Sequence, residues 1–224
     1  MGKKASQKAQ KKLENKVEKA QSHVSNLEIA QKLYEKGAKL VEAKHKTFND
    51  NLKKSRDGDW FYTMLSKGTA TDKISALAML VQKDPVATHP FLVQLLGLAK
   101  KHNRKQAEQA VTAFKDLFLQ NHIFKLQGGT KLHIFQRNPV IMAKQSACTD
   151  EEIVQAYHDH CIRELLREFC SNVLQQMSHA ELEFQKTAAL DIAAQILPYA
   201  RFVELGAPIV AIIVNKFGDS VKKI

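Results

Sequence analysis

The sequence predicts an all-α protein: a HEAT-like α-solenoid of helical repeats preceded by a long basic N-terminal helix. Apolar residues recur at spacings of three and four, short loops with Gly, Pro or capping residues separate the segments, and no run alternates convincingly as a half-buried strand would. The apolar segments come in pairs of roughly 30–45 residues, the spacing of HEAT-like repeats.

The N-terminal part is predicted as a basic disordered tail, residues 1–12, and a long basic amphipathic helix, residues 13–56. The apolar stripe of this helix comprises Leu13, Val17, Ala20, Val24, Leu27, Tyr34, Ala38, Val41, Phe48 and Leu52. Gln31 and His45 interrupt the stripe, and Gly37 lowers the local helix propensity. Such a stripe buries one narrow seam against a partner helix. That partner is either the rest of this chain or another protein.

Residues 57–224 are predicted as a helical-repeat domain. In its first half, the apolar segment that starts at Trp60 ends at Lys67-Gly68, and Thr71 or Asp72 caps a helix that Asp84-Pro85 stops. Thr88 and Pro90 mark the start of the next helix. The residues expected to face the core of the three helices are Ile74, Leu77, Leu80, Val81, Leu92, Leu95, Leu96, Ala99, Ala107, Ala110, Val111, Phe114, Leu117 and Phe118. The third of these helices is expected over 104–120.

The second half of the domain begins with an irregular loop near 124–146. Two capping boxes follow: Thr149-x-x-Glu152 is expected to open a helix that ends near Met177, and Ser178-x-x-Glu181 a helix that ends near Leu197. Pro208 marks the start of a last helix that extends to Gly218. The sequence therefore predicts short loops between all helices except at 124–146.

The net charge is concentrated at the N-terminus. The chain carries 34 Lys and Arg against 23 Asp and Glu, a formal charge of +11, of which residues 1–57 contribute +8 and the remainder +3. A basic arm binds phosphates through counterion release, although it can also serve only as a solvated tail. A basic turn between two helices adds further cations, which also favour a helix C-terminus. The candidate phosphate contacts are Lys3, Lys4, Lys8, Lys11, Lys12, Lys100, Lys101, Arg104 and Lys105.

Nothing in the sequence indicates catalysis, a metal or a cofactor. In His158-x-His160-Cys161, only His158 and Cys161 share a helix face, and two ligands do not complete a zinc site. We interpret the histidines as surface residues, and the three cysteines as small buried residues with inert thiols. Gly128-Gly129-Thr130-Lys131 lacks the spacing of a phosphate-binding loop. The start of the chain has no signal peptide, and its longest apolar run is too short to span a membrane, so we expect an intracellular protein.

Several motifs between residues 59 and 223 resemble a known family. Asp59-Trp60-Phe61-Tyr62, Ser66-Lys67-Gly68-Thr69 and the run from Asp72 to Pro85 are similar to the opening of the CCAAT/enhancer-binding-protein-zeta family of nucleolar-complex factors, whose fungal members are the maintenance-of-killer type. Ala113–Leu119, Lys131-Leu132-x-x-Phe135 and Val214–Lys223 resemble later segments. The signature residues, expected to be structural, are Trp60, Gly68, Asp72, Lys73, Ser75, Leu77 and Pro85.

The resemblance covers about 57–224 and implies a non-catalytic scaffold in early maturation of the large (60S) ribosomal subunit in the nucleolus. It implies contacts with pre-ribosomal RNA, with a second nucleolar-complex protein in a heterodimer, and with other assembly factors, without a membrane or a cofactor. Because the family's proteins are several times longer, the chain resembles an N-terminal portion or a shortened member. Two alternatives remain: a DNA-binding transcription factor and a purely protein-binding repeat module. The first is less favoured, because no helix has Arg, Asn and Gln at the spacing that reads base edges.

Overall fold

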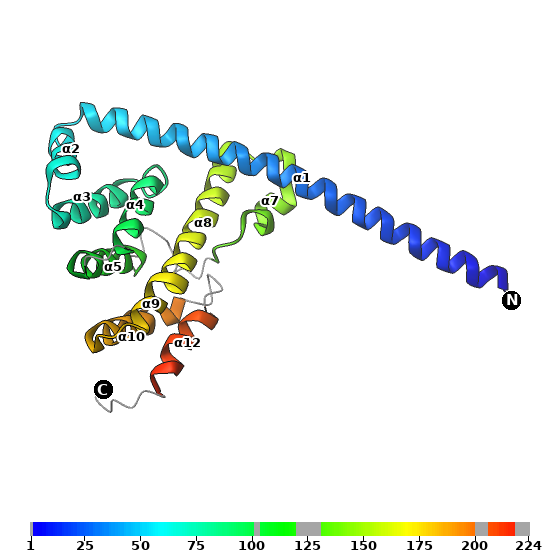
Figure 1. Cartoon of the computed structure of the whole chain (residues 1–224). Helices are drawn as coiled ribbons and strands as arrows, with labels where there is room; N and C mark the ends of the chain where they lie inside the picture. Colours follow the sequence, from blue (N-terminus) through cyan, green and yellow to red (C-terminus); the bar gives the residue numbers. More distant parts are fainter. Residues whose placement is uncertain (1, 101–103, 120–130, 200–205, 218–224) are drawn as a thin grey trace.

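The computed structural model describes residues 2–100, 104–119, 131–199 and 206–217, with side chains in the first helix described from residue 26 onward. Every regular element in this part of the chain is helical (Figure 1). The elements are α1 (Gly2–Lys54), α2 (Gly58–Lys67), α3 (Ala70–Lys83), α4 (His89–Ala99), α5 (Arg104–Leu119), η2 (Phe135–Arg137), α7 (Pro139–Lys144), η3 (Gln145–Ala147), α8 (Asp150–Glu168), η4 (Phe169–Leu174), α9 (Gln175–Ser178), α10 (Glu183–Ile196), η5 (Leu197–Tyr199) and α12 (Gly206–Phe217). The prediction of an all-α protein is confirmed.

The helices are arranged around α8, which runs through the centre of the molecule (Figure 1). Helix α1 crosses one end of α8, while α3, α4 and α5 contact one another beside it. The C-terminal helices α10 and α12 pack together near the other end. None of the described helices is both long enough and apolar enough to span a bilayer.

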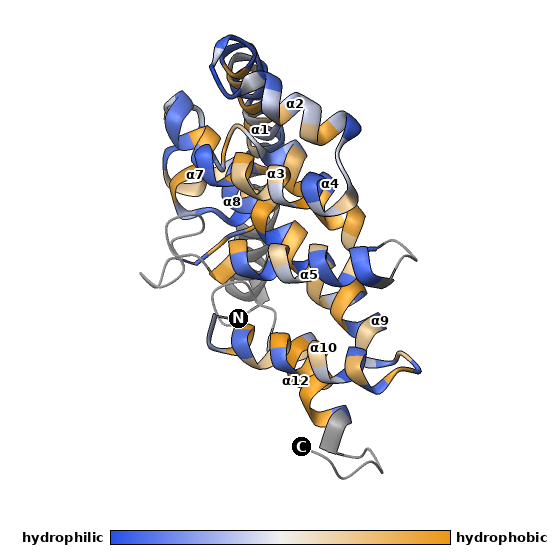
Figure 2. Cartoon of the chain, turned by 90° about the vertical axis from the view of Figure 1, so that its left-hand side faces the viewer, coloured by the Kyte–Doolittle hydropathy of each residue, from blue (hydrophilic) through white to orange (hydrophobic). Residues whose placement is uncertain are grey.

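The main core lies between α3, α4, α5, α8, α10 and α12. Of the apolar residues predicted to face the core, Ala107 is half-buried and Leu80 is buried in a smaller cluster with Leu52 and Phe61. The others are buried in the main core: Ile74, Leu77, Val81, Leu92, Leu95, Leu96, Ala99, Ala110, Val111, Phe114, Leu117 and Phe118. Figure 2 shows the resulting pattern on α3, α4 and α5, where hydrophobic and hydrophilic patches alternate along each ribbon. The three- and four-residue spacing therefore correctly identified the core faces of these helices.

The second half of α1 packs within this chain. Ala30, Val41 and Leu52 are buried, at 6–7% exposure, at intervals of eleven residues along one face. Gly37 lies at the crossing with α8, where an added Cβ would stand only 3.0 Å from Cβ of Tyr157. His45 donates through Nδ1 to the carbonyl of Ala87 at 2.7 Å. The seam from Ala30 to Leu52 is therefore intramolecular, which resolves for these residues the alternative left open by the periodicity.

Helix α1 is also longer than predicted. It begins at Gly2, so the structure has helix over residues 2–12, where the sequence predicts a disordered tail. The segment contains Ala, Lys and Gln and, after Gly2, no Gly or Pro, a composition that favours helix. In Figure 1 this N-terminal portion extends away from the other helices.

Two predicted helix starts are wrong. Thr69, rather than Thr71, caps α3, and its backbone N–H donates to the Asp72 carboxylate at 2.8 Å in a reciprocal capping box. The box predicted at Ser178 does not form, because its hydroxyl donates to the carbonyl of Gln175 at 2.7 Å and closes α9 instead. Helix α10 then begins at Glu183 without a side-chain cap.

The long helix opened by Thr149 contains an unpredicted π-helical turn. Thr149 and Glu152 form the expected capping box, with Thr149 N–H donating to Glu152 at 3.0 Å. Helical backbone then continues to Ser178, but Phe169–Leu174 form a π-helix between α8 and α9. Inserting this wider turn changes the direction in which the following side chains project, and π-turns occur frequently at functional sites.

Candidate nucleic-acid interface

The basic turn predicted between two helices lies where the sequence places it, between the end of α4 and the start of α5. Lys100 caps α4, and its ammonium group pairs with the carboxylate of Glu168 on α8, with the two side chains about two-fifths exposed. Lys105 is exposed at the start of α5. Lys101 and the side chain of Arg104 lie outside the described residues. The charge of Lys100 is therefore partly compensated by Glu168 in the absence of a bound phosphate.

The five arm lysines, Lys3, Lys4, Lys8, Lys11 and Lys12, belong to the first turns of α1. Their side chains are outside the described part, but their backbone lies on the opposite side of the molecule from α4 and α5 (Figure 1). The structure therefore does not bring the two predicted groups of phosphate contacts together. They form two separate candidate surfaces.

The charge along α1 is uneven. Residues 2–25 contain seven lysines and two glutamates, whereas residues 26–54 contain seven lysines and four acidic residues. In the second segment Lys36 also forms an ion pair of 2.6 Å with Asp150 of α8. The excess positive charge is therefore greatest where α1 extends away from the other helices.

The signature residues of the resemblance build the α2–α3 corner. Asp72 completes the capping box of Thr69 at the start of α3, and Leu77 is buried in the main core. Gly68 is required by close approach, because a Cβ there would lie 2.3 Å from the carbonyl oxygen of Met64. Trp60 is an exception, since it is 45% exposed and rests edge-on against the ring of Phe61. The remaining three signature residues are Lys73 and Pro85, both half-buried, and Ser75, which is exposed.

The interpretation of His158 as a surface residue is wrong. Its side chain is buried, at 7% exposure, and this burial, with the nearby His89, lowers its pKa to about 4 despite the opposing effect of Asp84. His160 and Cys161 are half-buried, and burial raises the pKa of the Cys161 thiol to about 11. Cys148 and Cys170 are buried as predicted, and their pKa values are also raised. All three thiols are therefore held in the protonated, unreactive form.

No cluster of His, Cys, Asp and Glu with metal-binding geometry occurs among the described residues. His89 of α4 lies near His45 of α1 and His158 of α8, and its pKa is lowered by burial and by His45. His45 has partners on both nitrogens, because Nδ1 donates to Ala87 and Nε2 accepts from Asn49 at 2.9 Å.

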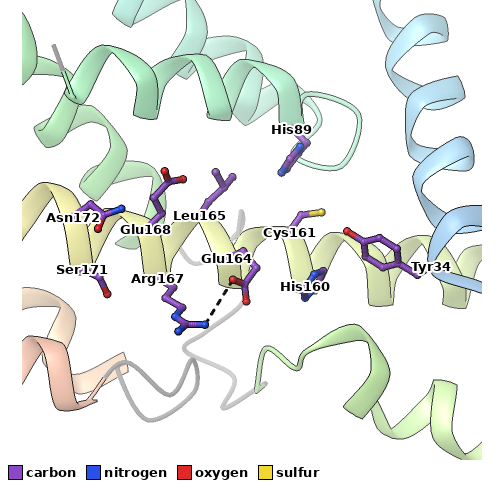
Figure 3. A pocket seen from close by; sticks show the side chains of 10 residues that line it. All are labelled: Tyr34, His89, His160, Cys161, Glu164, Leu165, Arg167, Glu168, Ser171 and Asn172. Atoms are coloured by element: carbon purple, nitrogen blue, oxygen red, sulfur yellow. Dashed lines mark ion pairs between the residues drawn. The ribbon is translucent and has the colours of Figure 1, made fainter. Parts of the chain in front are cut away.

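An open groove runs along α8, with a volume of about 580 Å³. Figure 3 shows Tyr34, His160 and Cys161 towards its α1 end and Ser171 and Asn172 towards the other. His89 of α4 and the α8 residues Glu164, Leu165, Arg167 and Glu168 complete the lining. A volume of this size is typical of a ligand-binding cleft.

The charged groups of the groove pair with one another. Glu164 accepts from Arg163 at 2.6 Å and lies 4.0 Å from Arg167, and Glu168 pairs with Lys100 of the basic turn. Two imidazole nitrogens of the lining, Nε2 of His89 and Nδ1 of His160, are buried and lack a hydrogen-bond partner in the described part of the chain. The groove therefore offers compensated charges and unsatisfied neutral polar groups.

The groove is not predicted from the sequence. The one available signal is a row of polar residues at intervals of four, His160, Glu164, Glu168 and Asn172, along one face of the helix. A row of this kind usually marks only a solvated helix face. The opposing side chains, Tyr34 and His89, come from distant parts of the sequence.

Comparison with known proteins identifies the relatives. Human CCAAT/enhancer-binding protein zeta is 31% identical over 202 residues, which are 88% of this chain and 18% of that protein. Nucleolar complex protein 1 of Drosophila melanogaster is 27% identical over 196 residues, 86% of this chain and 16% of that protein. The ribosome biogenesis protein NOC1 of Chaetomium thermophilum is 28% identical over 184 residues, 72% of this chain and 16% of that protein.

The chain thus spans less than a fifth of the length of these relatives. No family model matches it. The names of the relatives agree with the family that the motifs between Asp59 and Pro85 resemble, and the resemblance is confirmed. The chain is therefore a homologue of one segment of the CCAAT/enhancer-binding protein zeta and nucleolar complex protein 1 family.

Proposed function

We propose that the chain is a non-catalytic helical-repeat scaffold that acts in the nucleolus during early assembly of the large ribosomal subunit. The observation that carries this proposal is the homology to proteins named for the nucleolar complex and for ribosome biogenesis. The uneven charge of α1 supports a polyanionic partner, for which pre-ribosomal RNA is the candidate. The successive packing of α2 on α3, α3 on α4 and α4 on α5 is compatible with HEAT-like repeats.

A scaffold of this kind binds a second nucleolar-complex protein and other precursor-subunit assembly factors through its surface. Exposed apolar residues are available for such contacts, among them Met142 and Val214, which are 61% and 54% exposed. Helical repeats commonly provide extended binding surfaces, because each repeat leaves one face uncovered. Catalysis is not part of the proposal, since the relatives are named for assembly rather than for a reaction.

Sedimentation and RNA crosslinking in cells test the proposal. The tagged chain is expected to co-sediment with large-subunit precursors, and ultraviolet irradiation is expected to link it to precursor ribosomal RNA. A variant that lacks residues 1–25 is the informative comparison, because it keeps the intramolecular seam from Ala30 to Leu52. Migration of the full chain only in the free fractions, without RNA crosslinks, would exclude the scaffold role.

The name of the human relative favours a second candidate, sequence-specific DNA binding. Sequence is read by side chains that place donors and acceptors against base edges in the major groove. Binding of the chain to CCAAT-containing and scrambled DNA duplexes at physiological salt distinguishes the two functions. Equal affinity for both duplexes would eliminate the DNA-reading candidate and leave only charge-driven binding.

A further inference from the structure

The α8 groove is lined by aromatic and imidazole rings from separate helices. Its lining includes rings from three elements: Tyr34 of α1, His89 of α4 and His160 of α8. Tyr34 and His160 meet edge to face, with ring centroids 5.5 Å apart. Flat rings at the wall of an open groove are the groups on which unstacked bases pack in single-stranded RNA complexes.

The polar groups of the groove suit a neutral ligand with hydrogen-bonding edges. Nε2 of His89 and Nδ1 of His160 are desolvated without a partner in the described chain, which is a cost that a ligand can remove. The torsion χ2 is soft for an imidazole ring, so both rings can reorient when a ligand binds. The Ser171 hydroxyl and the Asn172 amide add further donors and acceptors at the other end.

The charges of the groove disfavour a strongly ionic ligand inside it. Glu164 is compensated by Arg163 and Arg167, and Glu168 by Lys100. An apolar peptide anchor is also disfavoured, because Leu165 is the only aliphatic side chain among the described residues that line the groove. The lining therefore favours a ligand group that is planar, uncharged and able to form hydrogen bonds.

The rim of the groove carries one cation in excess, because Lys100, Arg163 and Arg167 stand against the two carboxylates of Glu164 and Glu168. Arg167 is 62% exposed, and Lys100 connects the basic turn directly to the groove through its pair with Glu168. A nucleotide bound here has a phosphate site beside its base site. Ser171 and Asn172 belong to the π-turn, a local departure from α-helix that places both side chains in the lining.

We propose that the α8 groove binds unpaired bases of single-stranded RNA, one against the rings of Tyr34 and His160 and a second at Ser171 and Asn172. The phosphate between them lies beside Arg167 and Lys100. The proposal rests on the RNA-binding function proposed above and adds to it a preference for unpaired RNA. Phosphate contacts alone supply affinity without distinguishing single strands from duplexes. The groove supplies that distinction, because a base stacked within a duplex cannot enter it.

The test compares the full chain with two double variants on the same continuous helix. Ser171→Ala with Asn172→Ala removes two polar groups of the groove, and Gln175→Ala with Gln176→Ala removes two exposed groups one turn further along. The probes are a mixed-sequence RNA of about 12 nucleotides and the duplex of the same length, each followed by fluorescence anisotropy at several salt concentrations. Photocrosslinking with 4-thiouridine then locates the bound bases.

The groove variant is expected to bind single-stranded RNA about tenfold more weakly, because the hydrogen bonds to the base at the Ser171–Asn172 end are lost. Its duplex affinity and the dependence of binding on salt are expected to stay unchanged, since no phosphate contact is removed. The control variant is expected to match the unmodified chain in every measurement. The RNA is expected to crosslink to residues that line the groove, from Tyr34 at one end to Asn172 at the other.

Failure of this inference is distinguishable from failure of the proposed function. If the unmodified chain binds neither RNA, RNA binding as a whole is excluded. If it binds both RNAs equally and the groove variant changes nothing, the groove inference is wrong while charge-driven RNA binding stands. If the groove variant instead loses a co-purifying protein and keeps its RNA affinity, the groove is a peptide site and the inference is likewise overturned.

Discussion

The two halves of α1 differ in what they contact, although they form one continuous helix. Residues 26–54 place Ala30, Val41 and Leu52 against the rest of the chain, and their seven lysines are balanced in part by four acidic residues. Residues 2–25 extend away from the other helices and carry seven lysines against two glutamates. Packing and positive charge are thus separated along one helix, and each half can be altered without changing the other.

The largest expected effect comes from a charge placed in the packed half. Val41→Asp is expected to lower the free energy of unfolding by about 4 kcal/mol, because Val41 is only 7% exposed and a carboxylate there has no partner. Urea unfolding followed by circular dichroism measures the change. Ala43→Asp, at an exposed position of the same helix, is the matched control. Equal stability of the two variants would contradict the intramolecular seam.

Acid should loosen the packed region through His158. The native state keeps this buried ring neutral, with a pKa of about 4, while the unfolded chain takes up a proton near its ordinary value of 6.5. The contribution of His158 to stability is therefore complete above pH 6.5 and decreases by about 3 kcal/mol as the pH falls to 4. His158→Gln is expected to flatten this part of the stability profile, whereas His179→Gln, at an exposed position, leaves it unchanged. Parallel profiles for all three proteins would refute the assignment.

Removal of residues 1–25 tests the extended half. RNA affinity is expected to fall about 100-fold, because seven lysines are lost. The slope of log K against the logarithm of the salt concentration is expected to become shallower by up to about 5. The midpoint of urea unfolding should not move, since the seam from Ala30 onward is retained. Titrations at several salt concentrations measure both quantities. An unchanged salt slope would assign the arm to solubility and favour a purely protein-binding module.

The smallest effect concerns the helix crossing at Gly37. Gly37→Ala gains helix propensity, but the new Cβ lies 3.0 Å from Tyr157 and 3.3 Å from Ile153, so we expect a net loss of about 1 kcal/mol. At Gly97 of α4 an added Cβ meets nothing within 4 Å, and Gly97→Ala should stabilise the chain by about 0.5–1 kcal/mol. The thermal midpoints of the two variants should thus move in opposite directions. Stabilisation by both would show that α1 and α8 can separate slightly without cost.

The all-α class and the core faces of α3, α4 and α5 were predictable because these helices are amphipathic. Leu92, Leu95 and Phe114 are buried as their spacing requires, since burial of one stripe determines where each helix packs. Capping was predictable only in part: Thr149 caps α8, whereas Ser178 bonds to a carbonyl of its own preceding turn. Local side-chain hydrogen bonds compete with capping, and the sequence does not determine which of them forms.

The candidate site was predictable only in its charges. The basic turn at Lys100 lies between two helices as expected, but its ion pair with Glu168 depends on tertiary packing across 68 residues. The groove could not be derived, because it requires Tyr34, His89 and the π-turn at Ser171 to meet in space. Neither helical periodicity nor a short motif reports contacts of that range.

The crossing of α1 over α8 has a consequence for synthesis of the chain. Gly37 and Tyr157 are in contact but are 120 residues apart in the sequence. At a translation rate of about 5–20 residues per second, α8 is synthesised on the order of ten seconds after α1. During that interval the apolar residues around Ala30, which pack against Phe135 and Ile153, are uncovered, and the nascent chain is vulnerable to aggregation and to capture by chaperones.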